Sequence, residues 1–140
     1  MRILLVEDNP AEACLTREGF ADVGLIHELR VVDDGEKATA FLRREGNCAN
    51  EEVPDLVLLD LNLPKKCGHE VLKDIKSDPD LLHIPVLVVT NSHAMDDIEK
   101  VYRSNGNCYL VKPPDLNDFF SMVRRIVDFW WDTARLPPAV

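Results

Sequence analysis

The stretch "DLVLLDLNLP", residues 55–64, places four consecutive apolar residues, Leu56 to Leu59, directly before a carboxylate, Asp60. A run this short and this apolar is typical of a strand buried on both faces of a parallel sheet, where the alternation of apolar and polar residues disappears. The run therefore predicts that a rigid strand fixes Asp60 at its carboxyl edge.

Strand and helix patterns alternate along the rest of the chain. Strands are predicted at residues 2–6, 27–32, 55–59, 84–90 and 107–111, and helices at 9–24, 34–46, 68–76, 96–104 and from about 115 onward. Asn9 and Pro10 form an N-cap and N1 pair, and the first two helices are expected to close on Gly24 and Gly46. This order predicts a doubly wound α/β fold, in which helices cover both faces of a five-stranded parallel sheet.

The composition limits the classes of function. The chain has 140 residues, 46% hydrophobic and 29% charged, which is typical of a single soluble domain. We expect a cytoplasmic protein without a membrane span, because the apolar runs are short and the first is followed at once by acids. The net charge of −9 argues against nucleic acid as a partner. The four cysteines lack zinc spacing and are interpreted as reduced, mostly packing thiols.

Polar side chains follow four of the five predicted strands. They are Glu7 and Asp8, Asp60, Thr90 and Asn91, and Lys112. In a doubly wound sheet, chemistry collects beyond the carboxyl ends of the strands, so we expect these side chains to converge. Three carboxylates at close range repel one another unless a cation neutralises them, and oxygen ligands suit Mg²⁺.

This set of residue types suits phosphoryl transfer. A carboxylate such as Asp60, held beside Mg²⁺, is a nucleophile for a phosphoryl group. An ammonium such as that of Lys112 offsets charge on the phosphoryl oxygens, and a hydroxyl such as that of Thr90 donates a hydrogen bond.

Four motifs in this order and spacing resemble those of the response-regulator receiver domain, the phosphoacceptor of two-component signalling. They are "LLVEDN" (4–9), "LVLLDLNLP" (56–64) followed by Gly68, "VLVVTNS" (86–92) and "YLVKPP" (109–114). The resemblance covers residues 1–127 and implies the flavodoxin-like (βα)5 receiver fold.

The resemblance also implies a role for each matching residue. Asp60 would accept a phosphoryl group from a phosphohistidine of a sensor histidine kinase. Asp8, Asp60 and the main-chain carbonyl of Asn62 would hold Mg²⁺, with Glu7 acting through a water molecule. Thr90 and Lys112 would contact the phosphoryl oxygens, Tyr109 would be the switch aromatic that turns inward, and the Lys112–Pro113 bond would be cis.

Other residues near these motifs have less defined roles. Asn91 replaces the small residue that is usual after the threonine, and its bulk is expected to restrict access to the phosphoryl group. The histidines are interpreted as surface or loop residues, with His93 close enough to the site to modulate it. The four are His27, His69, His83 and His93.

The last predicted helix carries more apolar residues than one sheet face can bury. The stripe comprises Leu116, Phe119, Phe120, Val123, Ile126, Val127, Trp130 and Trp131, widened by Met122 and Phe129. The pattern "NCYLVKP" (107–113) followed by "FW" and "LPP" (136–138), together with the long "SDPDLLHIPV" loop (77–86), is similar to a subfamily of single-domain regulators that partner phytochrome-type histidine kinases. Members of that subfamily dimerise through the fourth and fifth helices, the fifth strand and the tail. We therefore expect a receiver domain at 1–127, a dimerising extension at 128–140, and no output domain.

Two other classes of function compete with a phosphorylated signalling protein. One is a binding module, a receiver-like adaptor; the other is of enzyme type, either a phosphatase or a flavin carrier. A receiver-like adaptor that never takes phosphate has no need of the acidic cluster. An aspartate-dependent phosphatase requires a second acid two residues after the nucleophile, where this chain has Asn62. A flavin carrier on the same layout requires a phosphate-cradling loop after the first strand, where this chain has "EDNPAEA" (7–13).

Overall fold

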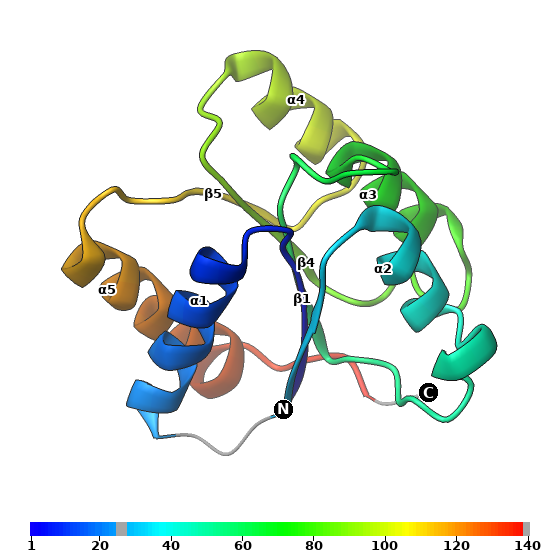
Figure 1. The fold of residues 1–140 in the computed structure, drawn as a ribbon, viewed down its shortest axis with the longest axis horizontal. Helices are drawn as coiled ribbons and strands as arrows, with labels where there is room; N and C mark the ends of the chain where they lie inside the picture. The colour runs from blue at the N-terminus through cyan, green and yellow to red at the C-terminus, as the bar shows by residue number, and fades with distance from the viewer. Residues whose placement is uncertain (25–27, 139–140) are drawn as a thin grey trace.

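The structure, a computed structural model, describes residues 1–24 and 28–138 and contains a five-stranded parallel sheet (Figure 1). The strands are β1 (Arg2–Val6), β2 (Glu28–Val32), β3 (Leu56–Leu59), β4 (Val86–Thr90) and β5 (Cys108–Val111). Their spatial order is β2-β1-β3-β4-β5. This is the flavodoxin-like order, and its switch point lies between β1 and β3. The predicted fold class is confirmed.

The helices form one layer on each face of the sheet (Figure 1). They are α1 (Pro10–Val23), α2 (Gly35–Leu42), α3 (Gly68–Ser77), α4 (Met95–Arg103) and α5 (Leu116–Val127). Helices α1 and α5 pack against each other on one face, and α3 lies between α2 and α4 on the other. Two short elements complete the fold, a 3-10 helix at Gly46–Cys48 and a π-helix at Asp128–Thr133.

The central strands bury both of their faces, as the apolar run before Asp60 predicts. In β3, Leu56 and Leu58 pack with the α1/α5 side, whereas Val57 and Leu59 pack in the opposite cluster beneath α2, α3 and α4. All four side chains are buried. Because successive side chains point to opposite faces, the strand contributes to two cores and is held from both sides.

The boundaries of the first helix match the prediction, but the second helix is shorter than predicted. Helix α2 ends at Leu42, and the left-handed residue of its cap is Arg44 (φ 56°); Gly46, two residues later, is also left-handed (φ 55°) but begins the 3-10 helix. The amide of Glu45 donates to Ala40 O (2.9 Å) and that of Arg44 to Phe41 O (3.2 Å), the two bonds of a Schellman cap. A non-glycine residue therefore caps this helix, and the sequence of the segment did not indicate that Arg44 would take this role.

The apolar stripe of α5 is divided between the core and the surface. Phe119, Val123, Ile126 and Val127 are buried against β1, β3 and β4. Trp130 packs partly against the same cluster, whereas Trp131 is exposed, so the adjacent tryptophans do point to different environments. After the π-helix the chain runs along the edge of the sheet where the strands begin, as the red segment of Figure 1 shows.

Gly68 allows the loop after β3 to close tightly onto the start of α3. A Cβ at this position would press against the main-chain carbonyl oxygen of Asp60 and lie 2.6 Å from Leu61 Cα. The glycine amide also donates to Leu61 O at 2.9 Å. The absence of a side chain at residue 68 therefore fixes the path of the chain directly after Asp60.

We expect Gly68→Ala to lower the free energy of unfolding by about 2–3 kcal/mol, because the clash is with backbone atoms that cannot rotate away. Urea denaturation measures the change. Lys73→Ala, an exposed position in the same helix, is the control and is expected to stay within about 0.5 kcal/mol of the wild type. Equal stabilities of the two variants would contradict this account of Gly68.

Candidate functional site

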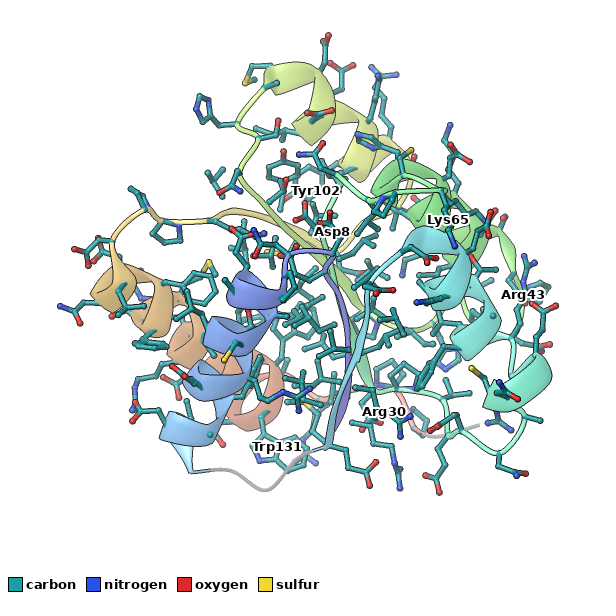
Figure 2. The ribbon with its side chains drawn as sticks, viewed as in Figure 1. Asp8, Arg30, Arg43, Lys65, Tyr102 and Trp131 are labelled. Carbon is teal, nitrogen blue, oxygen red and sulfur yellow. The ribbon has the colours of Figure 1, made fainter. Side chains whose placement is uncertain are left out.

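Three carboxylates meet at the carboxyl edge of the sheet. Glu7 and Asp8 follow β1, and Asp60 follows β3. One oxygen from each lies within 4.8 Å of the others. Glu7 and Asp60 are buried, whereas Asp8 is exposed at the rim of the sheet edge, where Figure 2 labels it. The predicted convergence of these acids is confirmed.

The ammonium group of Lys112 lies within this acidic cluster. Its Nζ donates to Glu7 Oε1 (2.6 Å), Asp60 Oδ2 (2.9 Å) and Glu12 Oε2 (3.0 Å). Lys112 is itself buried. An ammonium has three N–H groups, so the three acceptors use its whole donor capacity.

The charges of this cluster shift one another's protonation. Burial raises the pKa of Glu7 to about 7, although Lys112 opposes the shift; the nearby charge of Asp60 adds to it. Burial acts to lower the pKa of Lys112, but its hydrogen bonds to Glu7 and Asp60 outweigh burial, and the pKa rises. The lysine is therefore firmly charged, whereas Glu7 takes up a proton at a higher pH than an ordinary glutamate does.

Asp60 is oriented by two donors on different elements. Its Oδ1 accepts from the amide of Asn62 (3.2 Å), and its Oδ2 accepts from Lys112. Its own amide donates to Val6 O at 3.1 Å, which continues the ladder between β3 and β1. The side chain is thus fixed at the end of a strand that is buried on both faces.

Thr90 and Asn91 occupy the end of β4 beside this cluster. Thr90 is fully buried, and its Oγ1 accepts from the amide of Ser92 at 3.4 Å. Asn91 is exposed, and its Nδ2 donates to Glu12 Oε1 at 3.4 Å. The sequence placed both residues at the correct edge of the sheet.

Tyr109 points inward in this structure. Its ring packs against the core cluster beneath α2, α3 and α4, and its hydroxyl donates to the carbonyl oxygen of Ser92 at 2.7 Å. Burial raises the pKa of Tyr109. The aromatic side chain therefore contacts the loop between β4 and α4, two residues after Thr90.

The expected cis bond between Lys112 and Pro113 is wrong. Every peptide bond between described residues is trans. The trans form is intrinsically favoured by about 0.5–1 kcal/mol before proline. On the other side of Lys112, its amide donates to Thr90 O (2.8 Å), which continues the pairing of β4 with β5.

Glu12 is a member of the site that the sequence analysis missed. It lies in the first turn of α1 and joins Lys112 to Asn91 across the cleft. The position of Glu12 in the chain could have indicated this role. A helix that begins directly after β1, with Asn9 as its N-cap, places its first turn over the carboxyl edge of the sheet. An acid at the third helical residue is also the usual N3 position of a capping box, which gave it an ordinary explanation.

His69 is not the simple surface residue that the sequence suggested. It lies half-buried in α3, and its Nε2 is 3.0 Å from Asp97 Oδ1. Asp97 Oδ2 in turn accepts from the Ser92 hydroxyl at 2.6 Å. The hydrogen bond from Ser92, and then that from His69, lower the pKa of Asp97. A hydrogen-bonded chain therefore joins α3, α4 and the loop that follows Thr90.

The remaining histidines take different positions. His93 is exposed in the loop after β4, consistent with a position near the site, and His83 is half-buried just before β4. His27 lies outside the described residues. The cysteines are free thiols; Cys48 and Cys108 pack against the cores, whereas Cys14 is exposed, so the packing interpretation holds for only part of the set.

The residues fit a divalent cation. Three carboxylates lie close together, whereas Lys112 carries a single positive charge, so the site keeps an excess of negative charge that a hard cation would neutralise. Burial is the main cause of the raised pKa of Glu7, and the nearby charge of Asp60 makes a smaller contribution in the same direction. The arrangement suits one oriented carboxylate, one ammonium and one cation acting on a phosphoryl group.

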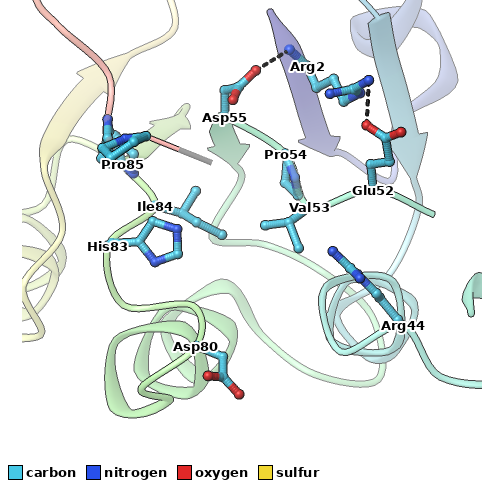
Figure 3. A pocket seen from close by; sticks show the side chains of 12 residues that line it. Arg2, Arg44, Glu52, Val53, Pro54, Asp55, Asp80, His83, Ile84 and Pro85 are labelled. Carbon is cyan, nitrogen blue, oxygen red and sulfur yellow. Dashed lines mark hydrogen bonds and ion pairs between the residues drawn. The ribbon is translucent and has the colours of Figure 1, made fainter. Parts of the chain in front are cut away.

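A separate cavity of about 250 Å³ lies at the opposite edge of the sheet, where the strands begin (Figure 3). Arg2 on its wall donates its amide to Asp55 (2.8 Å) and pairs with Glu52. Pro137 and Pro138 of the tail also line it. None of the predicted site residues lies here, so this cavity is distinct from the acidic cluster.

The fold and the site define a receiver, and sequence comparison identifies its family. Residues 3–124 match the response regulator receiver domain. The chain belongs to this family and is a response regulator of two-component signalling. The flavin-carrier and phosphatase interpretations are set aside, and an adaptor that never takes phosphate is not favoured.

Similar proteins include curated response regulators and response regulators of known structure. The chain is 49% identical to the response regulator Rcp1 of Synechocystis sp., over 98% of this chain and 93% of that protein. A solved structure of the phosphorylated cyanobacterial phytochrome response regulator RcpA has a TM-score of 0.95 and 50% identity, with 98% of both chains covered. The Mn²⁺-bound form of Rcp1 has a TM-score of 0.93 and 48% identity, covering 98% of this chain and 99% of that one.

Among residues 1–24 and 28–138, no helix has the length and apolar character needed to cross a membrane.

The pKa of Glu7 predicts how stability depends on pH in the metal-free protein. The folded-state pKa of about 7 lies above the ordinary value of 4.5, so between these values the folded protein binds a proton that the unfolded chain does not. The stabilisation is fully present below about pH 4.5 and is lost as the pH rises through about 7. We expect unfolding free energy to fall between pH 5 and 8, and Glu7→Gln to reduce the slope.

Urea denaturation across this range, in the presence of a chelator, tests the prediction. The histidines titrate in the same interval, so the informative quantity is the difference between the wild type and Glu7→Gln. Parallel pH profiles for the two proteins would show that Glu7 has an ordinary pKa.

Proposed function

We propose that Asp60 is the phosphoacceptor of this response regulator and takes its phosphoryl group from a sensor histidine kinase. The observation that carries the proposal is the Asp60 side chain itself, oriented by the Asn62 amide and the Lys112 ammonium beside two further carboxylates. One Asp60 oxygen attacks phosphorus, the bond from phosphorus to the histidine nitrogen breaks, and the imidazole keeps the electron pair and later takes up a proton.

The cation in this proposal is Mg²⁺, held by Asp8, Asp60 and the main-chain carbonyl of Asn62, with Glu7 acting through water. Its contribution is to neutralise charge on the phosphoryl oxygens while the donor group departs. The cluster of Glu7, Asp8 and Asp60 supports the proposal, as does the Mn²⁺-bound form of the similar protein Rcp1.

Lys112 and Thr90 are proposed to bind the phosphoryl oxygens. Lys112 already donates to Asp60 Oδ2, so a phosphoryl group on Asp60 would form within its reach. Thr90 lies at the end of the neighbouring strand and presents a hydroxyl. The same groups would assist both transfer to Asp60 and later hydrolysis, because each stabilises charge on the phosphoryl oxygens.

Tyr109 is proposed to report the state of the site. Its hydroxyl bonds to the Ser92 carbonyl in the loop after Thr90, so a shift of this loop changes the position of the aromatic ring. Its amide donates to the Tyr102 hydroxyl (3.2 Å), which links β5 to α4. The ring therefore connects the phosphorylation site to the outer face of the domain.

The proposed kinase is of phytochrome type. The support is the similarity to Rcp1 and to the phytochrome response regulator RcpA across nearly the whole chain. A cytoplasmic location is part of the same proposal, since the cysteines lack the spacing of a disulfide framework.

A homodimer through the last helix and the tail is also proposed, with a receiver domain at 1–127 and an extension at 128–140. A groove of about 770 Å³ runs along β5 and α5 and is lined by Leu110, Val111, Met122, Phe129 and Trp130. Val111, Leu116 and Phe129 are exposed apolar residues of this region. Contiguous exposed apolar surface is typical of an interface between proteins.

Asp60→Asn is expected to abolish phosphorylation while keeping the fold. Intact-mass analysis after incubation with acetyl phosphate and Mg²⁺ should detect one phosphoryl adduct on the wild type and none on the variant. The matched control is Asp55→Asn, an acid at the opposite end of β3. An adduct on the folded Asp60→Asn variant would place the phosphoacceptor elsewhere.

Val111→Glu is expected to weaken self-association at least tenfold, because it puts a charge into the proposed interface without emptying the core. Val111 is 41% exposed. Leu82→Glu, at a residue that is 49% exposed in the segment before β4, is the matched control. Light scattering over a concentration series measures both, and equal dimer fractions for the two variants would argue against this interface.

A further inference from the structure

Glu12 binds two groups that belong to different parts of the phosphorylation site. Its Oε2 accepts from Lys112 (3.0 Å), and its Oε1 accepts from Asn91 (3.4 Å). Asn91 follows Thr90 directly in the chain. A single carboxylate from α1 therefore bridges the end of β5 and the loop after β4.

Among the three acceptors of Lys112, Glu12 is the one whose hydrogen bond can break with the smallest loss of free energy. Its side chain is 28% exposed, against 3% for Glu7 and 8% for Asp60. It extends from a helix surface, so it can rotate into water without leaving a buried charge unpaired. Glu7, in contrast, also accepts from the Asn9 amide and is enclosed.

A phosphoryl group on Asp60 would compete with Glu12 for the same donor. Lys112 already uses its three N–H groups on three carboxylates, so a new oxygen acceptor requires that one of them be released. Glu12 Oε2 and Asp60 Oδ2 both bind Lys112 Nζ, so these two oxygens are at most about 6 Å apart. At this distance two partly buried charges interact strongly. The incoming group is anionic and is repelled by Glu12.

We propose that Glu12 is an internal competitor of the phosphoryl group. In the unphosphorylated protein its carboxylate holds Lys112 and Asn91, and phosphorylation of Asp60 displaces it. Displacement frees Lys112 for the phosphoryl oxygens and at the same time releases Asn91, the residue next to Thr90. Glu12 is a positioning residue, because it acts through Lys112 and Asn91. The inference rests on the proposed role of Asp60.

The competitor role predicts that Glu12→Gln accelerates phosphorylation. Glutamine keeps the length of the side chain and an oxygen acceptor for Lys112 but removes the charge. We expect the rate constant with acetyl phosphate, measured by intact mass at saturating Mg²⁺, to rise about tenfold. Saturation is established for each protein by Mg²⁺ titration, so that altered cation affinity does not enter the rate.

Two further readouts separate competition from a structural role. The affinity for beryllium trifluoride with Mg²⁺, a phosphoryl mimic measured by calorimetry, should rise in Glu12→Gln as the phosphorylation rate does. The advantage over the wild type should shrink as ionic strength increases, because its origin is charge. Glu12→Asp, which keeps the charge, should stay closer to the wild type than Glu12→Gln does.

Glu36→Gln is the matched control for net charge. Glu36 is an exposed acid in the first turn of α2, and its substitution by glutamine removes the same charge as Glu12→Gln does. It is expected to leave the rate within twofold. An equal acceleration in Glu36→Gln, or an unchanged or slower rate in Glu12→Gln, would overturn the competitor role. If the wild type itself acquires no phosphoryl group, the proposed role of Asp60 fails instead.

Discussion

The Lys112 ammonium is the interaction on which the site depends. It joins residues up to 105 positions apart in sequence and brings together the ends of β1, β3 and β5 with the first turn of α1. Its charge offsets only part of the acidic cluster. Removal of a buried partner leaves an uncompensated charge, so a substitution of Lys112 would disturb the fold and the chemistry together. The remaining negative charge is what makes the cluster suitable for a divalent cation.

The positions of these groups follow from the sheet. Parallel pairing of β1 with β3 aligns Val6 with Leu59, so the acids that follow each strand leave the sheet at the same level. Pairing of β4 with β5 aligns Thr90 with Val111, the residue before Lys112. Because both faces of β3 are buried, a one-residue shift would exchange its two sets of apolar side chains and misplace Asp60. The apolar run before Asp60 is therefore a requirement of the site as well as of the core.

The sequence predicted what depends on pattern and chain order. The fold class, the strand ends and the convergence of Glu7, Asp8 and Asp60 follow from periodicity and from the geometry of parallel sheets. It did not predict contacts that depend on side-chain reach between distant elements, such as Glu12 with Asn91 or His69 with Asp97. The sequence also did not predict the left-handed conformation of Arg44, because a cap without glycine depends on local hydrogen bonds. Family resemblance misled it at Pro113, whose preceding bond is trans.

The loop after β4 is held from three directions, and this explains how a small change at Asp60 can reach the surface. Thr90 Oγ1 binds the Ser92 amide from within, Glu12 binds Asn91 from α1, and the hydroxyl and carbonyl of Ser92 bind Asp97 and Tyr109. The first two contacts lie beside the proposed phosphoryl position, and the last two lead to α4 and β5. The two outer contacts, at 2.6 and 2.7 Å, are shorter than the two contacts beside Thr90 and Asn91, which are both 3.4 Å. If Asp60 is the phosphoacceptor, as proposed, a phosphoryl group there would change these contacts and with them the packing of α4 against β5.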